Sequence, residues 1–159
     1  MTRFLTAATM TLALTGASAL AMTPVEKVDV EADLTVIEND AAASVWSGLE
    51  GDLETALAER LVDQIAEDGA TIEVEIDTLE LANSFEKQIG IADSEISGDV
   101  KIKVPGLANN ERYTLTVSSE QAQGYFPDGT VVADLTMGSE TYYQAIVAAF
   151  AENIAQKLQ

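Results

Sequence analysis

One short motif in the sequence has the form of a catalytic pair: Ser84-Phe85-Glu86-Lys87. In serine acyl-transferases of the penicillin-binding type, a lysine one helical turn from the serine helps to deprotonate it. Those enzymes also need an S-D-N element and a K-T-G element, and the sequence contains neither. A four-residue match of this kind occurs often by chance, so we interpret it as a polar loop with an incidental Lys–Glu pair.

Paired carboxylates are the other groups that could perform acid–base chemistry, as they do in glycoside hydrolysis. The chain has 27 Asp and Glu residues, so some pairs must fall at a suitable separation by chance. We expect most of them on the solvated outer faces of strands and helices. A small hydrolase using carboxylates or the Ser84–Lys87 pair is the alternative hypothesis, and it predicts a concave pocket holding buried acids of raised pKa.

Calcium is the one cofactor with a physical argument, because hard cations bind carboxylate and carbonyl oxygens. A flat ladder of acids lacks the converging backbone oxygens of a calcium cage, and no D-x-[DN]-x-[DN]-G loop occurs. We therefore expect nonspecific cation condensation and predict no cofactor and no metal site; a carrier of small cations or basic peptides is a weaker hypothesis. The two acidic runs that would form the ladder, if their strands are neighbours, are Asp29, Glu31, Asp33 and Glu73, Glu75, Asp77.

The composition excludes several classes of chemistry. With no cysteine and no histidine, the chain has no disulfide, no thiol nucleophile, no imidazole base and no Cys or His metal site. Eight Lys and Arg residues against 27 acids give a net charge of −19, which argues against nucleic acid as a partner because phosphate binding needs clustered basic residues. Apolar residues make up 47% of the chain, enough for a folded core.

Residues 1–21 are typical of a cleavable secretory signal peptide. Arg3 supplies the positive start, residues 4–14 are uncharged and largely apolar, and Ala19-Leu20-Ala21 is a small-residue cleavage pattern. No cysteine follows the predicted cut, so we expect the mature protein to be free of a lipid anchor. These features predict a periplasmic or secreted protein whose residues 22–159 form a single domain.

Alternation of apolar and polar residues predicts four strands, each with one apolar face. They cover residues 28–37, 71–77, 96–104 and about 113–118. A long helix lies between the first two strands and another follows the fourth. The economical fold is α+β: a four-stranded, mostly antiparallel sheet with two long helices packed on one face, in the order strand-helix-strand-strand-strand-helix.

Each predicted helix carries a single apolar stripe. The first begins after Asn39-Asp40 and should end at Gly69 in the C′ position; the second begins at Ser139-Glu140, after a loop-like stretch from Gln121 to Met137. Trp46 could join Tyr142 and Tyr143 in a sugar-binding platform, but its place on the stripe favours core packing. The stripes are Trp46, Leu49, Leu53, Leu57, Leu61, Ile65 and Tyr143, Ile146, Val147, Phe150, Ile154, Leu158.

Three segments carry a family resemblance. They are Leu53–Gly69 (LETALAERLVDQIAEDG), Ile91–Val100 (IADSEISGDV), with an alanine–aspartate pair before a small residue–glycine–x–valine pattern, and the alanine-rich helix Tyr143–Leu158. Together they resemble bacterial envelope accessory domains: the periplasmic and lipoprotein components of curli secretion and of lipopolysaccharide transport, and the N-terminal domain of TolB. The resemblance implies binding and assembly roles rather than catalysis, and it transfers no site residue.

The leading hypothesis is a non-enzymatic, exported α+β protein that binds or supports an envelope protein. The sequence leaves the partner and the oligomeric state open. We expect binding at the polar face of the sheet and at the loop 121–137. The candidate partner-binding residues are Asp29, Glu31, Asp33, Glu73, Glu75, Lys101, Lys103, Tyr125 and Phe126.

Overall fold

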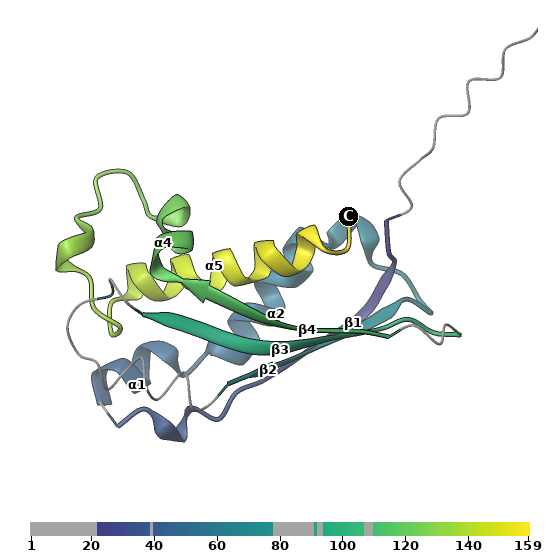
Figure 1. The fold of residues 1–159 in the computed structure, drawn as a ribbon, viewed down its shortest axis with the longest axis horizontal. Coiled ribbons are helices and arrows are strands. Elements are labelled where there is room, and N and C mark those ends of the chain that lie inside the picture. The colour runs from purple at the N-terminus through teal and green to yellow at the C-terminus, as the bar shows by residue number, and fades with distance from the viewer. Residues whose placement is uncertain (1–21, 39, 78–90, 92–93, 107–109) are drawn as a thin grey trace, which may run out of the picture.

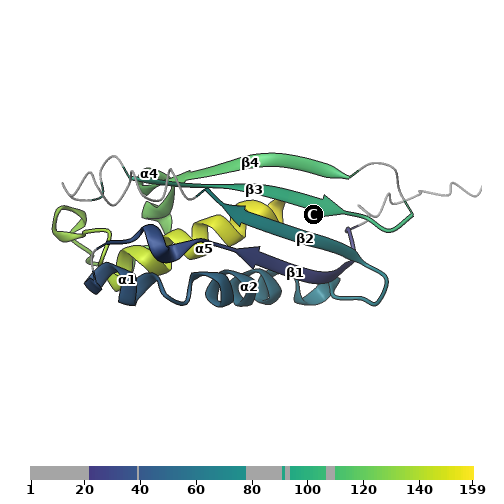
Figure 2. The ribbon, with the colours of Figure 1, turned by 90° about the horizontal axis from the view of Figure 1, so that it is seen from below.

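The sheet has four strands in the order of the sequence (Figures 1 and 2). The computed structural model describes residues 22–38, 40–77, 91, 94–106 and 110–159. β1 and β2 are parallel, whereas β2, β3 and β4 are successively antiparallel. Parallel neighbours need a crossover connection, and helix α2 lies within it. The strands are β1 Val25–Glu31, β2 Ala70–Ile76, β3 Glu95–Lys103 and β4 Glu111–Ser118.

Both long helices lie on the same face of the sheet, α2 over β1 and α5 over β4, and they pack against each other (Figure 1). The predicted α+β fold, with a mostly antiparallel sheet and two helices on one face, is confirmed. The helices are α1 Asp40–Trp46, α2 Leu49–Arg60, α4 Ser119–Ala122 and α5 Glu140–Gln156, with 3-10 turns η1 Leu34–Val36, η2 Val62–Gln64, η3 Gln123–Tyr125 and η4 Val132–Asp134.

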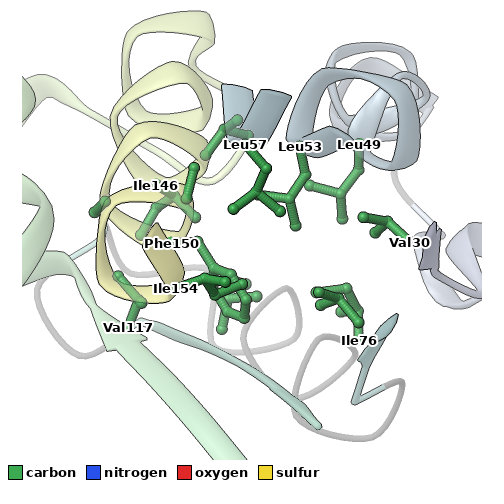
Figure 3. Packing of buried hydrophobic residues seen from close by; sticks show 14 of the residues in the cluster. Val30, Leu49, Leu53, Leu57, Ile76, Val117, Ile146, Phe150 and Ile154 are labelled. Atoms are coloured by element: carbon green, nitrogen blue, oxygen red, sulfur yellow. The ribbon is translucent and has the colours of Figure 1, made fainter. Parts of the chain in front are cut away.

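The hydrophobic core fills the space between the two layers (Figure 3). Leucines of α2 and the apolar stripe of α5 point toward Val30, Ile76 and Val117 of the sheet. Fully burying one such side chain contributes about 1.5–3 kcal/mol. At Gly98 a Cβ would lie 3.2 Å from the Phe150 ring and 3.1 Å from the Glu75 carbonyl, so the absence of a side chain there lets α5 approach the sheet.

The first strand is shorter than predicted. β1 ends at Glu31, not at residue 37. The Asp33 carboxylate accepts hydrogen bonds from the Thr35 backbone N–H at 3.1 Å and its hydroxyl at 2.6 Å, which starts the 3-10 turn η1. An aspartate side chain that bonds the backbone two residues on favours a turn over a strand, so Asp33 lies beyond the ladder in which the sequence pattern placed it.

The long first helix is also divided. A turn at Ser47-Gly48 separates α1 from α2, and α2 ends at Arg60 rather than continuing to residue 68. Trp46, Leu49, Leu53, Leu57 and Leu61 are buried as predicted. The last member of the predicted stripe, Ile65, is 54% exposed and makes an isolated parallel bridge with Val25.

Gly69 has a different role from the predicted helix cap. A Cβ at Gly69 would lie 2.6 Å from the Val25 carbonyl carbon and from the Glu26 nitrogen, a separation that no side chain permits. The residue with left-handed backbone in this turn is Asp68, with φ of 62°. Gly69 therefore allows the chain to pass directly against the start of β1.

Other boundaries agree with the prediction to within a few residues. The predicted loop 121–137 includes parts of α4 and two 3-10 turns, and α4 begins with a capping box between Ser118 and Gln121. The predicted signal peptide of residues 1–21 and the Ser84–Lys87 motif lie outside the described residues. No helix in the described part of the chain is long and apolar enough to cross a membrane.

Candidate functional site

The face of the sheet opposite the helices is lined by charged and hydroxyl side chains, and we call it the polar sheet face. Successive side chains of a strand point to opposite faces of the sheet. Because the apolar residues of each strand are buried under α2 and α5, the residues between them face the other side. The polar sheet face consists of Lys27, Asp29 and Glu31 of β1, Thr71, Glu73 and Glu75 of β2, Ser97, Asp99, Lys101 and Lys103 of β3, and Arg112, Thr114 and Thr116 of β4.

The strand register sets acids beside acids in one half of this face and beside bases in the other. Glu73 lies between Asp29 on β1 and Lys101 on β3, and Glu75 lies between Glu31 and Asp99. The acids of β1 and β2 are therefore neighbours, as the calcium argument required. Asp33 and Asp77, predicted members of the same ladder, lie beyond the strand ends.

Basic side chains from the sheet neutralise much of this ladder. The Lys27 ammonium lies 3.0 Å from the Asp29 carboxylate, the Lys101 ammonium lies 3.8 Å from Glu75, and Lys103 pairs with Glu73. The hydrogen bond to Asp29 raises the pKa of Lys27 above its ordinary value. Exposed ion pairs of this kind contribute about 0–1 kcal/mol each, so they determine the charge pattern more than the stability.

Asp99 is the carboxylate with the most side-chain partners on the polar sheet face. It accepts a hydrogen bond from the Arg112 guanidinium at 2.5 Å and another from the Thr114 hydroxyl at 2.8 Å. Both bonds favour the ionised carboxylate. The hydrogen bond from Arg112, and to a smaller extent the one from Thr114, holds the pKa of Asp99 below its ordinary value. The hydrogen bond to Asp99 raises the pKa of Arg112.

The polar sheet face is thus close to charge balance in a strongly acidic protein. It carries five acids and four bases (the residues named above), whereas the whole chain has 27 acids and 8 bases. Half of the basic residues of the chain are therefore gathered on this one face. The face is acidic along β1 and β2, and the lysines of β3 and the arginine of β4 bring its total charge close to balance.

Two open hollows lie along this face. One, of about 160 Å³, is lined by residues that include Asp29, Glu31 and Lys101. The other, of about 520 Å³, is lined by Glu75, Ile76, Asp77, Gly98, Asp99, Arg112 and Thr114. Its acids are exposed or half-exposed, and the pKa of Asp99 is lowered rather than raised. The acids that line this hollow are therefore not buried, whereas the hydrolase hypothesis requires buried acids.

The structure separates Tyr125 and Phe126 from the other candidate residues. Tyr125 belongs to η3, which packs against α5 in the helical layer, and its side chain is 37% exposed. Burial, and then the nearby Glu152 carboxylate, raise the pKa of Tyr125. Phe126 is half-buried against the core. The two aromatic residues and the polar sheet face are thus two different surfaces.

The three aromatic residues of the sugar-platform hypothesis are buried in the core. Trp46 and Tyr142 are 0% exposed and Tyr143 is 3% exposed. The Trp46 indole N–H donates to the Met137 carbonyl at 2.7 Å, and the Tyr143 hydroxyl donates to Asp52 at 2.5 Å. Their rings contact one another edge-on or tilted. The expected core packing of Trp46 is correct.

The candidate residues predicted from the sequence leave out six members of the polar sheet face that make side-chain bonds: Lys27, Ser97, Asp99, Arg112, Thr114 and Thr116. A usable signal was present for two of them. Asp99 shares the alternation of Lys101 and Lys103, and Arg112 continues that of Thr114 and Thr116. The diagonal pairing of Arg112 with Asp99 depends on the register of β3 against β4, which alternation alone does not give.

Within the described ranges, no group of three or more acidic side chains is placed to hold a metal ion. The acids of the polar sheet face are spread along the strands, and several of them are already bonded to Lys, Arg or Thr. Their arrangement suits contact with a broad surface better than enclosure of a single ion.

Comparison with known proteins gives little guidance. No protein-family model matches the chain, and no curated protein matches it. An uncharacterized protein of known structure aligns over 86% of this chain and 92% of its own, with 14% identity and a TM-score of 0.46. A candidate lipoprotein from Caulobacter crescentus CB15 aligns over 82% and 86%, with 11% identity and a TM-score of 0.39. Similarities at these TM-scores carry no information about function.

Proposed function

We propose that the protein is an exported, non-enzymatic binding or assembly accessory of the bacterial envelope, and that its polar sheet face docks on a protein partner. The observation that carries the proposal is the near balance of charge on that face. A partner surface of mixed charge can approach it without the repulsion that the acidic remainder of the molecule exerts on other acidic proteins. The resemblance to envelope accessory domains supports the same role.

The geometry of the face also favours a macromolecular partner. The side chains stand on four hydrogen-bonded strands, and ion pairs link β2 to β3 and β3 to β4. A surface fixed in this way loses little conformational entropy when it binds. Its hollows are open to solvent and polar, unlike the concave, mostly apolar pockets that hold small molecules.

Export is tested by the N-terminus of the protein recovered from the envelope of a bacterial host. Cleavage after the small-residue pattern predicts a mature chain that begins at Met22, which mass spectrometry of the intact protein would show. An uncleaved chain retained in the cytoplasm would contradict the proposed location without bearing on the polar sheet face.

Docking is tested by charge reversal with a matched control. Lys103→Glu places a negative charge on the polar sheet face opposite Thr71 and beside Glu73. Lys157→Glu makes the same change at an exposed residue just after α5, on the helical side. After cross-linking and capture from envelope extract, we expect Lys103→Glu to lose the partner and Lys157→Glu to keep it. Equal capture by both variants, or no partner in native and cross-linked samples, would contradict the proposal.

A further inference from the structure

The two edges of the sheet differ in how they are covered. At β1, the Val30 N–H donates to the Glu54 carboxylate at 3.1 Å and the Ala32 N–H donates to Glu50 at 2.9 Å. Near the start of β1, the Val25 carbonyl accepts from the Ala66 N–H at 3.0 Å. Side chains of α2 and the segment after η2 therefore bond three polar backbone groups along this edge, which hinders the pairing of another strand there.

The backbone groups on the other edge can be assigned from the ladder. The Ser119 N–H donates to the Ser94 carbonyl at 3.0 Å, so this pair is hydrogen-bonded, and bonded and non-bonded pairs alternate along antiparallel strands. The hydrogen-bonded pairs of β3 and β4 are then Ile96–Val117, Gly98–Leu115 and Val100–Tyr113. The backbone N–H and C=O groups of the odd-numbered residues of β4 therefore point toward β3. The N–H and C=O groups of Arg112, Thr114 and Thr116 point outward.

Two further contacts agree with this assignment. The Asp77 N–H donates to the Ser97 carbonyl at 2.8 Å, so odd-numbered residues of β3 pair with β2 and its even-numbered residues pair with β4. By the same alternation the Ser118 N–H points outward, and it donates a hydrogen bond to the Gln121 side-chain oxygen at 2.9 Å. The open part of the edge therefore runs from Arg112 to Thr116.

Nothing in the described ranges bonds the outward N–H groups of Arg112, Thr114 and Thr116, and all three residues are exposed. Figure 2 shows β4 at the margin of the sheet farthest from α2. A strand edge of this length with open backbone groups is a template for another strand.

We propose that two copies of the chain associate through their β4 edges, antiparallel about a two-fold axis at Thr114. This register sets Thr114 opposite Thr114 of the second copy, and sets Arg112 opposite Thr116 and Thr116 opposite Arg112. All outward N–H and C=O groups from Arg112 to Thr116 then have a partner. A two-fold axis requires a self-complementary patch of this kind.

The side chains of β4 fit a second copy in the same register. Directly opposite residues interact across strands, and like charges there are destabilising. In this register Thr114 lies opposite the hydroxyl of Thr114 in the second copy. Tyr113 lies opposite Leu115 of the second copy, and Glu111 lies opposite Val117. The charge of Arg112 is already paired with Asp99 of its own chain. Pairing centred at Arg112 itself would set two guanidiniums face to face. The Thr114 register therefore avoids every direct like-charge pair.

The dimer would extend the polar sheet face. A two-fold axis perpendicular to the sheet keeps both polar faces on one side and both helical layers on the other. The result is a continuous sheet of twice the width, with the basic side chains of β3 and β4 toward its centre and the acids of β1 and β2 toward its two margins. This self-association does not depend on the proposed function, and the two can fail separately.

The first experiment measures the monomer–dimer equilibrium of the purified full chain by sedimentation at low and high salt. Each copy has a net charge of −19, so screening should strengthen the dimer. Thr114→Lys sets two ammonium groups opposite each other and should raise the dissociation constant about five-fold. Thr35→Lys is the control, since that exposed hydroxyl also donates to an aspartate and lies far from β4. A monomer at every concentration and salt level would overturn the proposal.

The second experiment tests the register. The chain contains no cysteine, so one introduced thiol reports one contact. In a hydrogen-bonded pair the Cα atoms are about 5.5 Å apart, within the range of a disulfide. Thr114→Cys should therefore form a disulfide dimer under mild oxidation.

Thr116→Cys is the matched control, because two such residues would lie about four residues apart along the strands, or about 13 Å. It should form a dimer only when mixed with Arg112→Cys. Equal disulfide formation by Thr114→Cys and Thr116→Cys alone would contradict this dimer, even if the protein proves dimeric by sedimentation.

Discussion

Asp99 joins β3 to β4 on the polar sheet face through Arg112 and Thr114. Its folded-state pKa is lowered, so the stability that it contributes is present above its unfolded pKa of about 3.9 and is lost as the pH falls through the lower folded value. Asp99→Asn should therefore reduce the melting temperature at pH 7, and the difference from the wild type should shrink below about pH 3.

Thermal unfolding between neutral and acidic pH measures this effect. Asp128→Asn is a suitable control, since Asp128 is exposed and forms no ion pair with any described residue. A loss in Asp99→Asn that stays constant down to the lowest pH would contradict the role given to the ionised carboxylate.

Gly98 shows how a single residue controls the fit of α5 on the sheet. Gly98→Ala adds a Cβ 3.2 Å from the Phe150 ring and 3.1 Å from a carbonyl, and overpacking of this kind costs about 1–3 kcal/mol. Gly51→Ala in α2 meets nothing within 4 Å and should add up to about 1 kcal/mol of stability. Urea unfolding of both variants measures the change in the free energy of unfolding. Equal changes in the two would show that the space at Gly98 does not restrict the packing of α5 on the sheet.

At the scale of elements, α2 covers the edge of β1 as well as the apolar face of the sheet. Glu54→Ala removes the acceptor of the Val30 N–H and should cost about 1 kcal/mol. Glu59→Ala changes an exposed residue of the same helix and should cost less than about 0.5 kcal/mol. If urea unfolding gives equal values for both, the carboxylate does not contribute to the cover of this edge.

The sequence pattern predicted the elements that have one apolar face, because burial on one side of a strand or helix leaves a direct periodic signal. Ile72, Val74 and Ile76 and the stripe of α5 are buried as expected. The pattern did not predict where β1 ends or that the first helix divides into α1 and α2. Asp33 and Ser47-Gly48 form local turns, and these turns leave the apolar periodicity of the sequence unbroken. Gly69 was assigned to a helix end, since the close approach of β1 is a tertiary contact.

The sequence predicted part of the candidate site, because alternation shows which residues of a strand face outward but not how neighbouring strands are aligned. Alternation gave outward residues on each of the four strands, but the ion pairs of Lys103 with Glu73 and of Arg112 with Asp99 are diagonal contacts that depend on strand register. Tyr125 and Phe126 were predicted to belong to the second candidate surface, the loop 121–137, and the sequence does not show which layer of the fold that loop joins. The chain turns back over α5 after β4, which moves them to the other layer.

At the scale of the whole molecule, the net charge of −19 is unevenly distributed. The polar sheet face is close to balance, so divalent cations should gather around the molecule without a preferred site. We expect millimolar calcium to raise the melting temperature no more than matched magnesium does. A large calcium-selective shift, measured by scanning fluorimetry, would reveal a specific site that the described residues do not form.

We expect the polar sheet face, and not the helical layer, to contact an envelope protein. Photo-cross-linking in cells tests it most directly, with the reactive group placed at Lys101 on the polar sheet face or at Glu59 on the outer side of α2. We expect a discrete adduct that contains a second protein species from position 101 and none from position 59. Adducts from position 59 alone, or the same adducts from both positions, would contradict it.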